Sequence, residues 1–193
     1  MRFVLLILFP FIIEAQNLPI TGEVRADSSF VCIDWLQSDS SAFGVKEICN
    51  SENFIEIRLK THIMASSELL ILSFKNNEWF AEKHSFEYVT KKKKVISVTP
   101  KKEIRKDSAT LFTTIFENLK SNMVFLLPDQ KNLKKEERAL IVSHGVLYSL
   151  SFKAGNSFRR YNYSNPEIFT KYFPTVLAYK QMTQIVTLLN SIF

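Results

Sequence analysis

The residues of this sequence best suited to binding a charged partner are the cations between positions 91 and 106. This segment reads KKKKVISVTPKKEIRK and holds eight cations among sixteen residues, with Glu103 as its single acid. The cations are Lys91, Lys92, Lys93, Lys94, Lys101, Lys102, Arg105 and Lys106. Such a patch attracts an anionic lipid surface, an acidic glycan or an acidic protein. Lysines also keep sheet edges from pairing with other chains, so a purely protective role stays open.

A second group of cations lies in the stretch FRRYNYSNPEIF, residues 158–169. Arg159 and Arg160 could hold the charge of a ligand while the neighbouring tyrosines stack on it, so both arginines join the candidate binding residues. The same stretch also fits the end of a strand that runs into a capped helix. The whole chain has a formal net charge of +6, but no recognised nucleic-acid-binding module occurs and no nucleic acid partner is expected.

Motifs for catalysis and for metal binding are absent from the sequence. There is no GxSxG, GxxxxGK[ST], GxGxxG, HExxH or CxxC pattern. Glu82 and His84 would share one face of a strand, which gives two metal ligands and no evident third. We therefore predict no catalytic residue, no metal and no cofactor. A hydrolase whose site assembles in space from Glu82, His84 or His144 is the alternative.

Cys32 and Cys49 are the two cysteines of the chain. An even pair in an oxidising compartment predicts a disulfide. Closing a loop of this size contributes roughly 3 kcal/mol in the chain-entropy model. Two free thiols, or one thiol acting as a nucleophile, are the alternatives.

The first residues are typical of a secretory signal. Arg2 gives a positive start, and an uninterrupted apolar run from Phe3 to Ile13 follows. This run is too short to span a bilayer, which needs about 20 residues, but it suits a signal peptide cleaved near Ala15. We expect residues 1–15 to be removed and residues 16–193 to form one periplasmic or secreted domain without a transmembrane segment. An uncleaved anchor or a buried strand of an intracellular protein is the alternative.

Alternating apolar and polar residues predict an antiparallel sheet. Strands are expected at 30–36, at 54–59 and at 95–99, the last ending at Pro100. Residues 68–89 predict a hairpin that turns at Asn76-Asn77, since asparagine tolerates the positive φ of such turns.

A second hairpin is predicted over residues 145–163, with Gly155-Asn156 as its turn. The resulting register puts Phe152 opposite Arg159, Leu150 opposite Tyr161 and Tyr148 opposite Tyr163. Both tyrosines then face the core, while Phe158, Arg160 and Asn162 lie on the other face. A slip by one residue would bury Arg160 and Asn162 without partners, which is costly. FRRYNYSNPEIF is therefore interpreted first as a joint between a strand and a helix.

Two longer helices are predicted around this sheet. Asp107 or Ser108 caps the first, which carries Leu111, Phe112, Ile115, Phe116 and Leu119 on one face. Asn165 caps a short helix with Pro166 at its first position, and Pro174 ends it. The second long helix presents Tyr179, Met182, Val186, Leu189 and Phe193 at spacings of three and four.

These patterns together predict an α+β domain. It should have a mainly antiparallel sheet of five to seven strands, with the helices at 108–120 and 175–192 packed on one face. The function we expect is that of an exported, non-catalytic binding or structural protein whose 91–106 segment contacts an anionic surface or partner. An exported hydrolase, or an accessory or inhibitor subunit of another exported protein, is the alternative.

Overall fold

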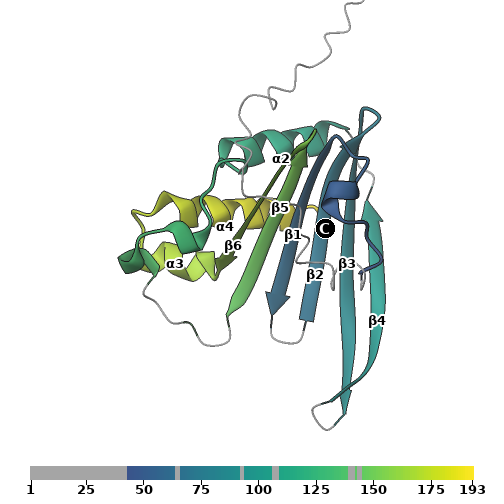
Figure 1. Cartoon of the computed structure of the whole chain (residues 1–193), viewed down its shortest axis with the longest axis horizontal. Coiled ribbons are helices and arrows are strands. Elements are labelled where there is room, and N and C mark those ends of the chain that lie inside the picture. Colours follow the sequence, from purple (N-terminus) through teal and green to yellow (C-terminus); the bar gives the residue numbers. More distant parts are fainter. Residues whose placement is uncertain (1–42, 64–65, 92–93, 106–108, 139–141, 143–144) are drawn as a thin grey trace, which may run out of the picture.

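The chain builds a six-stranded antiparallel sheet with its helices grouped on one side (Figure 1). The computed structural model describes residues 43–63, 66–91, 94–105, 109–138, 142 and 145–193, with the backbone alone at 86–91, 94–99 and 109. The strands are β1 (Ile55–Ile63), β2 (Ser66–Lys75), β3 (Glu78–Lys91), β4 (Lys94–Arg105), β5 (Val146–Ala154) and β6 (Ser157–Ser164). Their order in the sheet is β4-β3-β2-β1-β5-β6, so β4 and β6 form its two edges.

Both predicted hairpins form with the expected turns. Asn76 and Asn77 have φ of 52° and 62° and join β2 to β3. Gly155, with φ of 56°, turns β5 into β6. The register of β5 and β6 pairs Phe152 with Arg159, Leu150 with Tyr161 and Tyr148 with Tyr163, which confirms the prediction.

One local prediction is wrong, and a second holds for the position of the residue but not for its hydrogen bond. β4 does not end at Pro100 but continues to Arg105, with Pro100 paired to Phe86. Proline is tolerated there because β4 is an edge strand, so the missing N–H interrupts no second ladder. Asn165 does precede the helix α3 (Pro166–Tyr172), yet its side chain makes no capping bond. Its Oδ1 instead accepts a hydrogen bond from the backbone N–H of Val146, at 2.7 Å.

The helices α2 (Ala109–Ser121) and α4 (Leu177–Asn190) cover one face of the sheet, and the predicted α+β architecture is confirmed. The predicted apolar faces of both helices enter the core, where Phe112, Phe116 and Met182 are fully buried. Leu111 and Phe193 are exceptions, because their side chains stay 39% and 37% exposed. β1 contributes Ile55, Ile57 and Leu59 to the same core.

The segment between α2 and the turn η2 (Gln130–Asn132) is held against the sheet by side chains of β6. The guanidinium of Arg159 donates to the carbonyls of Phe125 and Leu127, at 3.0 and 2.5 Å. The hydroxyls of Tyr161 and Tyr163 donate to the carbonyls of Val124 and Pro128, at 2.8 and 2.6 Å. Both tyrosines are fully buried, as predicted. FRRYNYSNPEIF is thus a structural joint whose tyrosines belong to the core.

The edge of β6 is covered by side chains from the same segment. Asp129 accepts a hydrogen bond from the backbone N–H of Asn162, and Gln130 accepts one from that of Ser164. These bonds occupy donors that an exposed edge strand would otherwise offer to another chain.

A buried ion pair fixes the segment 43–53, which includes the short helix η1 (Ile48–Asn50), onto β1. The carboxylate of Glu56 accepts hydrogen bonds from Arg58, Ser51 and Asn53. The guanidinium of Arg58 also donates to the carbonyl of Lys46, at 2.7 Å. Glu56 and Arg58 are 1% and 3% exposed, so both charges depend on these contacts.

The buried tyrosines predict alkaline unfolding. Burial raises the pKa of Tyr148, Tyr161, Tyr163 and Tyr179 above the usual value near 10. A raised folded-state pKa stabilises the fold below pH 10, and that stabilisation is lost as the pH rises toward the folded pKa. We expect the absorbance change of these four phenols at about 295 nm to coincide with loss of circular dichroism above pH 10. Ionisation of all four while the sheet signal persists would show that they are accessible.

Several predictions fall on residues outside those described. They are the signal peptide at 1–15, the strand at 30–36, the helix cap at Asp107 or Ser108, and the residues Cys32, Lys92, Lys93, Lys106 and His144. Within the described part of the chain, no helix has the length and apolar character needed to cross a membrane.

Candidate functional site

The β3–β4 hairpin extends beyond the rest of the sheet as a two-stranded ribbon (Figure 1). The pairing of β3 with β2 ends at Ser85, whereas its pairing with β4 continues to Lys91 and Lys94. We call residues 86–99 the basic ribbon. Its last described pair is Lys91 with Lys94, the first and last of four consecutive lysines in the sequence.

The register of the basic ribbon pairs apolar residues with one another along its two strands. Tyr88 pairs with Val98 and Phe86 with Pro100. The pairing shifts between Val89 and Thr90, which indicates a β-bulge. Bulges increase the local twist of a ribbon and discourage further strand pairing along it. A narrow end of this kind is poorly suited to extend a sheet with another chain.

The other described cations of the 91–106 segment lie at the base of the ribbon and contact the domain itself. Lys101 forms an ion pair with Glu103 at 2.9 Å, and Lys102 forms one with Glu82 at 3.1 Å. The guanidinium of Arg105 donates to the carbonyl of Ile192. The predicted basic patch therefore divides into a terminal group at 91–94 and a basal group engaged with the fold.

The two arginines of FRRYNYSNPEIF lie on the opposite edge of the sheet from the basic ribbon and on opposite faces of β6. Arg159 faces the helices and binds the 122–133 segment, so its charge is committed to the fold. Arg160 lies on the other face, near Ser149. The predicted binding residues thus do not form one continuous site.

The face of the sheet opposite the helices carries the Glu82–His84 pair considered for catalysis. The imidazole Nε2 of His84 lies 3.0 Å from the carboxylate of Glu82. This hydrogen bond, with further contributions from Lys102, lowers the pKa of Glu82 to about 2 despite partial burial. A carboxylate with so low a pKa is a weak base at neutral pH. No group of three or more potential metal ligands occurs among the described residues.

Cys49 lies within η1. Its predicted partner Cys32 is outside the described residues, so the bridge stays a prediction. The intact mass under non-reducing conditions, before and after alkylation, would test it.

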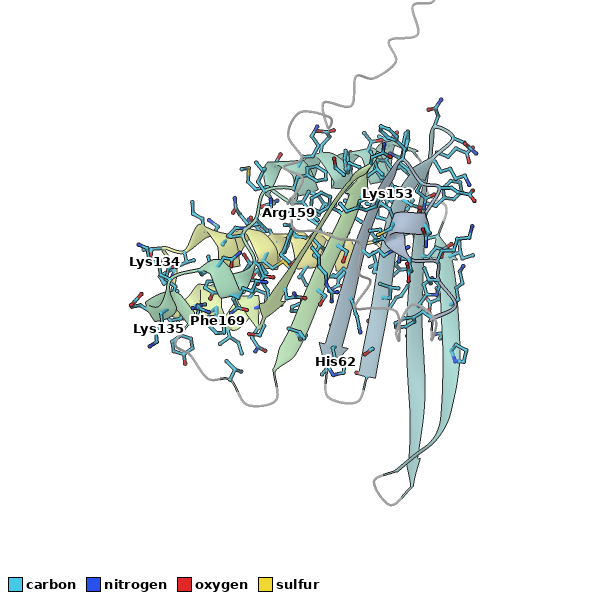
Figure 2. All side chains as sticks on the ribbon, viewed as in Figure 1. His62, Lys134, Lys135, Lys153, Arg159 and Phe169 are labelled. Carbon is cyan, nitrogen blue, oxygen red and sulfur yellow. The ribbon has the colours of Figure 1, made fainter. Side chains whose placement is uncertain are left out.

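A basic cavity that the sequence did not predict lies on the same face, between β1, β5 and β6. It has a volume of about 220 Å³ and is lined by Lys60, His62, Leu147, Ser149 and Arg160. We call it the basic hollow. His62 marks its position near the end of β1 (Figure 2). The period-2 alternation of each strand places these residues on one face, but the neighbouring strands that join them are far apart in sequence.

Comparison of the chain with protein-family models, with curated proteins and with solved structures finds no match.

Proposed function

We propose that the protein is an exported, non-catalytic binding protein whose basic ribbon engages an anionic lipid surface. The observation that carries this proposal is the projection of β3 and β4 beyond Ser85, the last residue of β3 that pairs with β2. A ribbon that ends in Lys91–Lys94 can approach a flat anionic surface while the domain stays in solution.

Electrostatics and composition both favour a membrane as the surface. Each lysine near an anionic bilayer contributes roughly 1 kcal/mol of attraction, which decays over about one Debye length. The sequence around the lysines, YVTKKKKVI, also supplies apolar side chains on both sides of the charges. Tyrosine in particular is enriched at membrane interfaces.

Vesicle flotation of the mature chain tests the proposal. We expect binding to phosphatidylcholine vesicles that contain phosphatidylglycerol and little binding to pure phosphatidylcholine. Changing Lys91, Lys92, Lys93 and Lys94 to glutamine should lower the partition coefficient by about a hundredfold or more at low salt, because four attractions are lost. Raising the salt concentration should weaken binding of the unchanged protein in the same direction.

A matched control removes the same charge elsewhere. Lys134, Lys135, Lys171 and Lys180 are exposed, and Figure 2 shows Lys134 and Lys135 well away from the ribbon. The fourfold glutamine variant at these positions should retain most of its binding. Equal losses of binding in the two variants would show that only the net charge of the protein matters, and not the position of the lysines. Absence of binding to anionic vesicles would overturn the proposal. Preferential binding to an acidic glycan or protein would replace the membrane as the partner.

A further inference from the structure

We propose that the basic hollow is a binding site for a small organic anion, with its carboxylate or phosphate group held between Lys60 and Arg160 and its apolar part against Leu147. This site is independent of the basic ribbon, which lies at the other edge of the sheet.

The strand register builds the polar end of the hollow. Lys60 of β1 pairs with Ser149 of β5, and Ser149 pairs with Asn162 of β6. Arg160 pairs with Ser151, two residues along each strand from the Ser149–Asn162 pair and therefore on the same face. Strands lie about 4.8 Å apart, so an ammonium, a hydroxyl and a guanidinium converge from three strands.

Hydrogen bonds fix the orientation of these groups. The hydroxyl of Ser149 donates to Oδ1 of Asn162 at 2.5 Å, and the guanidinium of Arg160 lies 3.4 Å from the same hydroxyl. Nδ1 of His62 lies 2.9 Å from the hydroxyl of Ser67. Ser149 is 7% exposed, which makes it a buried point of attachment for the arginine. A guanidinium held in this way suits the bidentate recognition of an oxyanion.

The charges in the hollow favour an anion. Partial burial lowers the pKa of Lys60, and the neighbouring positive charge of Arg160 lowers it further. An oxyanion between the two cations would interact favourably with both of them. We therefore expect the pKa of Lys60 to rise when the site is filled.

Leu147 makes the site suitable for an organic anion. Its side chain is 44% exposed and borders the hollow. It also borders a second cavity of about 430 Å³ next to Asp129 and Asn162. A water molecule occupies about 30 Å³, so the 220 Å³ of the hollow has room for more than a single ion.

The backbone beside Leu147 is fixed by a close packing contact. A Cβ on Gly145 would lie 2.2 Å from Nδ2 of Asn165, which excludes any larger residue without movement. Asn165 in turn binds both the N–H and the carbonyl of Val146. The apolar side of the hollow is therefore built on an ordered backbone.

Phenyl phosphate and inorganic phosphate are suitable probes, because they share the oxyanion and differ in the apolar group. We expect both to shift the amide resonances of residues 60–62, 147–149 and 160–162, with tighter binding of phenyl phosphate. Lys60→Met and Arg160→Met should each lower the affinity for either probe about tenfold or more, the size of one charge-assisted hydrogen bond. Leu147→Ala should weaken phenyl phosphate binding and leave inorganic phosphate unchanged.

Lys75→Gln provides the matched control, since it removes one cation from β2 that pairs with Glu52 at 2.8 Å, outside the hollow. Circular dichroism confirms that each variant is folded before its affinity is compared. Equal effects of Lys75→Gln and Arg160→Met, or shifts spread over the whole surface, would overturn the proposal. Retention of phenyl phosphate binding by the Lys91–Lys94 glutamine variant would separate this site from the ribbon, whatever the result with vesicles.

Discussion

Arg58→Met is expected to lower the free energy of unfolding by about 3–5 kcal/mol, the loss typical of breaking a buried ion pair. The carboxylate of Glu56 is 1% exposed and would remain without its cation. The substitution also removes the donor to the carbonyl of Lys46, so the segment 43–53 loses a second attachment. Urea unfolding followed by circular dichroism measures the effect.

The double variant Glu56→Gln/Arg58→Met separates charge burial from the remaining contacts. Because it removes both charges, its loss of stability should be smaller than the sum of the two single losses. Lys46→Gln is the matched control, since it breaks the ion pair with Glu52, in which both side chains are largely exposed. Exposed pairs contribute little, so Lys46→Gln should leave the unfolding midpoint nearly unchanged. A loss in Arg58→Met no larger than that in the control would contradict the buried pair.

Arg159→Met is expected to have the other large effect, a loss of about 3 kcal/mol or more in the free energy of unfolding, because two charge-assisted hydrogen bonds are removed. Its guanidinium donates to the carbonyls of Phe125 and Leu127, and hydrogen bonds to charged groups contribute about 1.5–3 kcal/mol each. Phe125 and Leu127 are almost fully buried, so water would not readily replace the lost donors at their carbonyls. Tyr161→Phe, which removes one neutral donor to Val124, should cost about 1–2 kcal/mol.

Hydrogen exchange tests whether the loss of stability in Arg159→Met arises in residues 122–133. In Arg159→Met, amides in residues 122–133 should lose more protection than those of α4. Lys171→Met, which removes an exposed cation from α3, should change neither stability nor exchange. Uniform loss of protection in Arg159→Met would mean that the arginine supports the whole fold and not this segment.

Arg159 and Arg160 are adjacent in β6 but have different roles, because their side chains lie on opposite faces of the sheet. Successive side chains of a strand point to opposite faces, so Arg159 enters the helical layer and Arg160 borders the basic hollow. We therefore expect the Arg159 variant to affect stability and the Arg160 variant to affect anion affinity.

Features that depend on local sterics and periodicity could be predicted from the sequence. The turns at Asn76-Asn77 and Gly155-Asn156 follow from residues that tolerate positive φ. The register of β5 and β6 follows from the need to bury one alternating set of side chains. The apolar faces of α2 and α4 follow from the helical period.

Features that depend on strand order became visible only in the folded chain. Pro100 lies within β4 because that strand is an edge, and the ribbon projects because β2 is shorter than its neighbour β3. Lys60, Ser149 and Arg160 meet because β1, β5 and β6 are adjacent, although Lys60 and Ser149 lie 89 positions apart in the sequence. Local patterns specify which face a residue occupies, whereas the packing of the whole chain specifies which strands, and hence which residues, become neighbours on that face.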